Sequence, residues 1–175
     1  MEDAVHIALA GLPGQRLADQ RAAALLELFY PVHYRTNMAV EDAMRGALSR
    51  KQAAILWLIR CSGSEGRSMR RKEIVLRLQD WFEISSPAIT QALRRMARPP
   101  LGLVRLIEEA DSAREKRVVL TPKGEEFLRR MVERGHAFIL NLMRQLCGDQ
   151  VGSGIEFLRA AVDAVERVHS DDQRR

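Results

Sequence analysis

The change in apolar periodicity at Pro99-Pro100 is the feature that most constrains the fold of this chain. Between residues 49 and 98, apolar residues recur at the three- and four-residue spacing of amphipathic helices, in three successive segments. After the two prolines, which stop a helix, the segments 103–108 and 116–120 instead look like two short strands around a polar turn. The sequence therefore predicts a mainly α-helical fold with a small β-hairpin that follows three helices.

Capping residues mark the helix boundaries in this part of the chain. Ser49 and Gln52 have the spacing of a capping box, which predicts that the first of the three helices begins there. The second helix is expected over 69–82. Ser86, the last residue of the connector that follows, is expected to cap the third helix, which has Pro87 in its first turn and runs to about residue 98.

Longer amphipathic segments flank this core on both sides. Residues 15–38 are expected to form a helix that Pro31 kinks or divides. A helix that opens at Thr121 continues to about residue 147, and a second capping box, Ser153 with Glu156, predicts the start of a last helix. Their apolar stripes exceed what one chain of 175 residues would cover, which predicts self-association. We expect an N-terminal extension (1–14), one domain (15–170) with a core (49–120) between dimerisation helices (15–45 and 121–170), and a tail (171–175).

Composition excludes several classes of protein. A content of 46% hydrophobic residues is enough to bury a core, so the chain is not expected to be disordered. No run of about 18 apolar residues occurs, so no membrane span is expected. Glu2 and Asp3 give the start of the chain the wrong charge for a secretory signal, and the expected location is the cytoplasm. Cys61 and Cys147 lack the spacing of a disulfide framework or a zinc site, and burial as small apolar residues is favoured over redox sensing.

The positive charge is confined to one part of the chain. The net charge is +5, from 28 Lys plus Arg and 23 Asp plus Glu. Between Arg67 and Arg117 there are 12 basic and 7 acidic residues, and the rest of the chain has 16 of each. The core, and not the flanking helices, therefore carries the whole excess and is the expected contact for a polyanionic partner.

Three helices followed by a two-stranded hairpin is the order of a winged helix-turn-helix. In that fold a tight connection holds two helices at an angle, and the second helix presents its N-terminal residues to base edges in the major groove while cations further along hold phosphates. Thr90 could contact a base or bond to a carbonyl of its own helix. The candidate DNA-contacting residues are Ser85, Ser86, Pro87, Ala88, Thr90, Gln91, Arg94, Arg95 and Arg98 on the helix, with Arg114 and Lys116 on the hairpin.

Short segments in the same order resemble the MarR family of bacterial transcription regulators, named for multiple antibiotic resistance. The similar segments are 48–52, 84–90, 102–105, 114–118, and Leu120-Thr121-Pro122 with Gly124. The resemblance extends over roughly residues 20 to 165 and implies an obligate homodimer that binds a palindromic operator and is often released by a ligand or oxidant. The sequence departs from the family pattern at Ser112, where an acidic residue is usual, and at the additional Pro99-Pro100.

The sequence predicts a DNA-binding transcription regulator and not an enzyme. It lacks the Gly-x-Ser-x-Gly, Ser-x-x-Lys, phosphate-loop and His-Glu-x-x-His motifs of common catalytic sites, and neither a cofactor nor a metal is expected. The expected partners are double-stranded DNA, a second copy of the chain and a small effector, and repression is favoured over activation. The alternative is a winged-helix module that mediates protein assembly without sequence-specific DNA binding.

Overall fold

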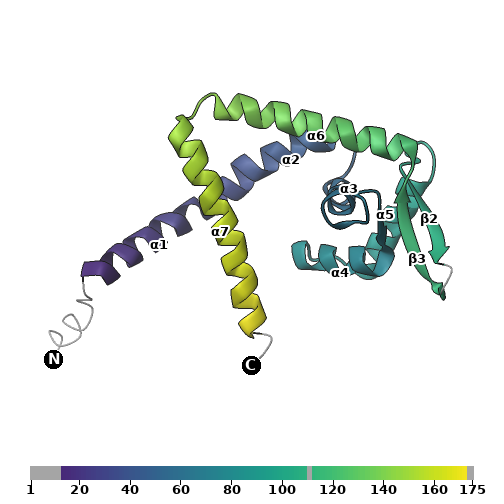
Figure 1. Ribbon diagram of the computed structural model, residues 1–175, viewed down its shortest axis with the longest axis horizontal. Coiled ribbons are helices and arrows are strands. Elements are labelled where there is room, and N and C mark those ends of the chain that lie inside the picture. Colours follow the sequence, from purple (N-terminus) through teal and green to yellow (C-terminus); the bar gives the residue numbers. More distant parts are fainter. Residues whose placement is uncertain (1–12, 110–111, 173–175) are drawn as a thin grey trace.

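The computed structural model describes residues 13–109 and 112–172. Figure 1 shows the helices and the hairpin of the core gathered at one end, while the first and last helices extend away from them. A mainly helical fold with a small sheet is therefore confirmed. The elements are α1 (Pro13–Pro31), the π-helical segment η1 (Val32–Asn37), α2 (Met38–Arg45), α3 (Arg50–Ser62), β1 (Ser68–Arg70), α4 (Arg71–Trp81), α5 (Ser86–Ala97), β2 (Val104–Glu109), β3 (Ser112–Leu120), α6 (Pro122–Met143) and α7 (Gly148–Asp172).

The sheet has three antiparallel strands in the order β1-β3-β2, where the sequence predicted two strands. Met69 of β1 and Leu106 of β2 pair with Val118 of β3 from opposite sides. The helix predicted over 69–82 therefore begins two residues later, at Arg71. A strand of three residues is too short to show a two-residue alternation, and its partner lies far along the chain. The predicted turn is also shorter, because β3 already begins at Ser112.

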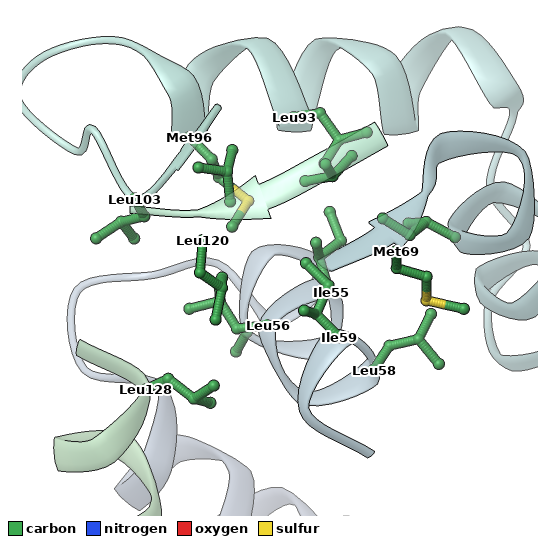
Figure 2. Packing of buried hydrophobic residues seen from close by; sticks show 14 of the residues in the cluster. Ile55, Leu56, Leu58, Ile59, Met69, Leu93, Met96, Leu103, Leu120 and Leu128 are labelled. Atoms are coloured by element: carbon green, nitrogen blue, oxygen red, sulfur yellow. The ribbon is translucent and has the colours of Figure 1, made fainter. Parts of the chain in front are cut away.

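The hydrophobic core lies between α3, α4, α5 and the sheet, and the first turns of α6 close one side. Figure 2 shows side chains of these elements converging around α3. Among the described residues, the buried ones are all apolar. The fully buried large side chains are Leu48, Ile55, Leu56, Leu58, Ile59, Ile74, Leu78, Ile89, Leu93, Met96, Leu103 and Met131. This packing fixes the positions of α4, α5 and the hairpin relative to one another.

Two helix starts of the core follow the sequence prediction and one differs. Ser49 and Gln52 form the predicted capping box, in which the Ser49 hydroxyl accepts from the Gln52 N–H at 3.3 Å. Thr121 caps α6, since its Oγ1 accepts from the Gly124 N–H at 3.0 Å. The predicted cap of α5 was wrong by one residue: the N-cap is Ser85, without a side-chain hydrogen bond, and Ser86 is the first helical residue.

The flanking helices begin and end at other residues than predicted. As predicted, Pro31 divides the first helix, because α1 ends there and a π-helical segment follows. The helical chain then continues through α2 to Arg45, beyond the expected end at residue 38. The last helix begins at Gly148 and not at Ser153, which lies inside α7. At this earlier start, the side chain of Gln150 accepts from the Cys147 N–H at 3.1 Å.

The first and last helices leave apolar side chains uncovered. Every described side chain of α1 is exposed, and so is most of α7. In contrast, α2 packs against α6, and the Arg134 guanidinium donates to the Met44 carbonyl oxygen at 2.7 Å. Residues 1–12 of the predicted extension and 173–175 of the predicted tail lie outside the described residues.

The prediction of buried cysteines was wrong for the single chain, because Cys61 and Cys147 are both exposed free thiols. Cys61 lies two positions beyond the buried Ile59 and therefore on the opposite side of α3. Cys147 lies between α6 and α7, where the chain changes direction. None of the described helices is long and apolar enough to cross a membrane.

Candidate nucleic-acid interface

A short connector joins α4 to α5 and holds the two helices in a helix-turn-helix. Phe82 and Ile84, both half-buried, pack against the core from this connector. The Gln79 side chain donates a hydrogen bond to the Ile84 carbonyl oxygen at 3.3 Å, which fastens the connector to the end of α4. The N-terminal end of α5 is therefore placed by apolar packing on one side and leaves Ser85, Pro87 and Ala88 exposed on the other.

The two faces of α5 differ sharply in character. Ile89, Leu93 and Met96 are completely buried against the core. Gln91, Arg94 and Arg98 follow one another at helical spacing on the opposite face and are exposed, and Ala88 and Arg95 flank this row. The structure thus brings the predicted polar and basic residues of this helix together on one accessible surface.

Two arginines of α5 and its C-cap residue, Arg98, are available to a partner. Arg94, Arg95 and Arg98 are exposed, and the described part of the chain offers none of them an ion pair or a side-chain hydrogen bond. A cationic helix face that lacks internal carboxylate partners keeps its full charge for an external anion.

Thr90 is engaged inside the protein. Its hydroxyl donates to the Ser86 carbonyl oxygen at 3.0 Å and accepts from Nη1 of Arg71, also at 3.0 Å. Of the two roles open for Thr90, the geometry favours the bond to its own helix over base contact. The half-buried Ser86 likewise contributes its carbonyl oxygen to this arrangement.

The hairpin of β2 and β3 forms the wing beside α5. Lys116 of β3 is exposed and lies opposite Glu108 of β2, with 4.0 Å between Nζ and the carboxylate. The strand register shifts after Glu108, toward the tip of the hairpin. The backbone of Arg114 belongs to β3, but its side chain lies outside the described residues, so its predicted DNA contact stays a prediction.

Sequence reasoning missed one residue of this surface, Arg71. Together with two predicted cations it lines a hollow of about 160 Å³ between α4, α5 and the wing. The sequence places it in a basic stretch at the start of a helix, which is typical of a solvated face. No local signal could reveal its contact with Thr90, which is 19 residues further along the chain. The hollow is lined by Arg71, Thr90, Leu93, Arg94, Leu106 and Lys116.

Comparison with known proteins agrees with this geometry. A family model described as a winged helix DNA-binding domain matches residues 48–124. No curated protein sequence matches the chain. The matched segment begins just before α3 and ends in the first turn of α6, so it contains the core, the helix-turn-helix and the wing.

The structure is also similar to solved transcription regulators. A MarR family protein from Bacillus stearothermophilus has a TM-score of 0.70 at 15% identity, over 85% of this chain and 97% of that one. A MarR family transcription regulator has a TM-score of 0.68 at 18% identity, over 89% and 97%. A mutant of MarR from E. coli complexed with operator DNA has a TM-score of 0.58 at 20% identity, over 79% and 95%.

The chain therefore contains a winged helix DNA-binding domain, and its fold is that of MarR family transcription regulators. This confirms the resemblance that the sequence motifs predicted. Of these similar structures, one is described as a MarR family transcription regulator and another as a complex with operator DNA. Taken together, the matched domain and the fold support DNA binding by this chain.

Proposed function

We propose that this chain is a MarR family regulator that binds double-stranded operator DNA through α5. The observation that carries the proposal is the exposed row formed by Gln91, Arg94 and Arg98, opposite a completely buried apolar face. A glutamine near the start of such a helix can bond to the edge of an adenine, and the arginines behind it reach phosphates or guanines. The packing of the other face makes this surface rigid, which lowers the entropy cost of binding.

The regulator acts as a homodimer in this proposal. Large apolar side chains are exposed on α1 and α7, among them Leu26 (74%), Phe29 (59%), Leu158 (61%) and Val162 (59%). Contiguous apolar surface of this kind marks an interface, because leaving it in water is unfavourable. A second copy of the same chain supplies matching apolar faces, and closed two-fold symmetry covers both sets at once.

Two-fold symmetry determines the form of the operator. Each protomer presents one α5, so the dimer contacts two half-sites in successive major grooves on one side of the duplex. The half-sites then lie roughly 34 Å apart, one helical turn, and the operator is palindromic.

We further propose that the dimer represses transcription and is released by a small effector. A protein that covers an operator excludes other proteins from it, which favours repression. A second hollow of about 460 Å³ lies between the end of α3, the turn after it and α6, and Arg60, Arg67 and Arg129 are among the residues that line it. A ligand held there would contact both the DNA-binding core and a dimerisation helix, and could therefore change the angle between them.

A protein-assembly module is the second candidate. The wing carries exposed Glu108 beside Lys116, which reduces its attraction for phosphates, and Trp81 at the end of α4 is 52% exposed. Such a surface suits a protein partner better than a polyanion. The uncompensated arginines of α5 favour DNA over this alternative.

Selection of bound duplexes from a random DNA pool tests the proposal. The pool is incubated with the chain, with and without candidate small effectors and thiol oxidants. We expect enrichment of a two-fold symmetric sequence, and loss of binding with one class of additive. Failure to enrich any sequence at low salt would favour the assembly module.

A further inference from the structure

The hollow between α4, α5 and the wing has a basic rim over an apolar floor. Its floor consists of Leu93, which is completely buried, and Leu106, which is half-buried. Arg71, Arg94 and Lys116 approach it from three different elements. The alternation along β3 places Lys116 on the same face of the sheet as the buried Val118, which is the face toward α5. Figure 1 shows α5 beside the hairpin along this edge.

One of the three cations is held in place by hydrogen bonds. Nη1 of Arg71 donates to the Thr90 hydroxyl, which in turn donates to the Ser86 carbonyl oxygen. A guanidinium group has five N–H donors, so this bond fixes the orientation of Arg71 and leaves donors for a ligand. The Thr90 hydroxyl is thereby a positioning group, because it acts on a ligand through Arg71.

Positive charge exceeds negative charge around this hollow. Among the described residues, Glu108 is the carboxylate paired with a lining cation, at 4.0 Å from Lys116, and both side chains are largely exposed. An exposed pair at this distance contributes little. Arg71 and Arg94 form no ion pair with any described residue. Three like charges around one hollow repel one another, and a bound anion removes that repulsion.

We propose that this hollow binds one phosphate group of the DNA backbone, with Arg71, Arg94 and Lys116 as its ligands. The inference rests on the proposed function, which supplies the duplex. In this arrangement Gln91 of the exposed row contacts a base, and the strand that passes between α5 and the wing places one phosphate over the hollow, within reach of Arg94. Contacts of this type fix the register of the protein on DNA without reading sequence.

Single substitutions of the rim test the site. Arg71→Gln and Lys116→Gln are compared with Lys51→Gln, which removes an equal charge from the exposed start of α3. On a duplex obtained by selection, each rim variant should weaken binding roughly tenfold, the value of one charge-assisted hydrogen bond. The slope of log affinity against log salt should fall by roughly one, on selected and unrelated duplexes alike. Lys51→Gln should change neither quantity, and equal effects from all three variants would contradict the proposal.

Neutralising DNA phosphates one at a time locates the contact. A methylphosphonate replaces each backbone phosphate of the duplex in turn. At one position in each half-site, this replacement should weaken DNA binding by the wild-type protein roughly tenfold. DNA binding by the double variant of Arg71→Gln and Lys116→Gln should be unaffected there. The exposed Lys116→Gln keeps this test valid if Arg71→Gln perturbs folding, which thermal melting reports.

Three outcomes would overturn the assignment. If every methylphosphonate acts on the double variant as on the wild type, the hollow binds no phosphate. If inorganic phosphate binds to the wild-type protein and not to the double variant, while no methylphosphonate weakens DNA binding, the hollow takes a free anion and not the duplex. If the wild-type protein binds no duplex under any condition, the proposed function itself fails. This outcome differs from failure of the phosphate site alone, in which the wild-type protein still binds the selected duplex.

Discussion

The carbonyl oxygen of Leu103 lies so close to Gly124 that a Cβ on this glycine would be 1.9 Å from it. The same oxygen accepts the Thr121 N–H at 3.0 Å, so the first turn of α6 rests directly on the start of the wing. This contact joins the DNA-binding core to a helix that we assign to dimerisation. Gly124→Ala should therefore destabilise the protein by at least about 2 kcal/mol, because backbone atoms must move apart.

Thermal or denaturant unfolding measures this effect. Gly152→Ala is the matched control, since no atom lies within 4 Å of the Cβ position in α7. Replacement of an exposed helical glycine by alanine stabilises a helix by about 0.5–1 kcal/mol. Equal effects of the two substitutions would mean that the contact between Leu103 and Gly124 is not tight.

Gln91→Ala should change which sequences the protein binds. The amide of Gln91 lies at the exposed start of α5, where a side chain reaches base edges. We expect discrimination at one base pair of each half-site to fall by roughly 1–3 kcal/mol. Selection of bound sequences, repeated with the variant, measures this loss. Arg98→Ala is the control, which should weaken binding to all sequences alike; the same uniform loss for Gln91→Ala would reduce its role to positioning.

Arg114→Ala should reduce affinity and its dependence on salt. The hairpin presents this residue near the tip of the wing, and a long cation is favoured at a phosphate or in the negative potential of the minor groove. The salt slope should fall by roughly one unit. Titration of a labelled duplex at several salt concentrations measures it, and an unchanged slope would remove Arg114 from the interface.

Leu158→Asp should convert the dimer to a monomer. Leu158 is 61% exposed in the single chain and belongs to the apolar stripe of α7. A carboxylate buried in the interface would cost more than the apolar contact contributes. Light scattering at micromolar concentration should show one chain, and operator affinity should fall with it. The neighbouring Glu156→Ala should leave the mass unchanged, and a monomeric wild-type protein would contradict dimerisation altogether.

The acid stability of α6 should depend on Glu126. Hydrogen bonds from Arg129 and then Arg130 lower the pKa of this carboxyl from 4.5 to about 2. Because the pKa is lower in the folded state, the contribution to stability is complete above pH 4.5 and is lost as the pH falls toward 2. Glu126→Gln should therefore make the melting temperature less dependent on pH in this range. The group is exposed, so the change should be small, and an unaltered pH profile would mean that the salt bridges contribute nothing.

Local sequence signals predicted the parts of the fold that local interactions determine. Ser49 with Gln52 and Thr121 cap their helices by bonds within three residues, so a motif is enough to find them. The apolar spacing on α5 likewise identified its buried face, and by exclusion the exposed row. These two kinds of signal define most of the winged helix.

Other parts depend on contacts that a local pattern does not contain. Residues 68–70 form the strand β1 because Met69 pairs with Val118, which is far along the chain. Arg71 belongs to the candidate DNA-binding surface because it donates a hydrogen bond to Thr90. The start of α7 was missed because the glycines between 148 and 154 are typical of a loop. Cys61 is exposed because it lies on the side of α3 that faces away from the core. The type of a single residue does not reveal on which side of a helix it lies.

The number of chains on one operator duplex decides whether the protein binds DNA as a dimer. The selected duplex is bound at low salt, its protected bases are mapped by footprinting, and the mass of the complex is measured. We expect two chains on one duplex and two symmetric protected regions whose centres are roughly one helical turn apart. One chain per duplex, a single protected region, or no protection at all would contradict this expectation.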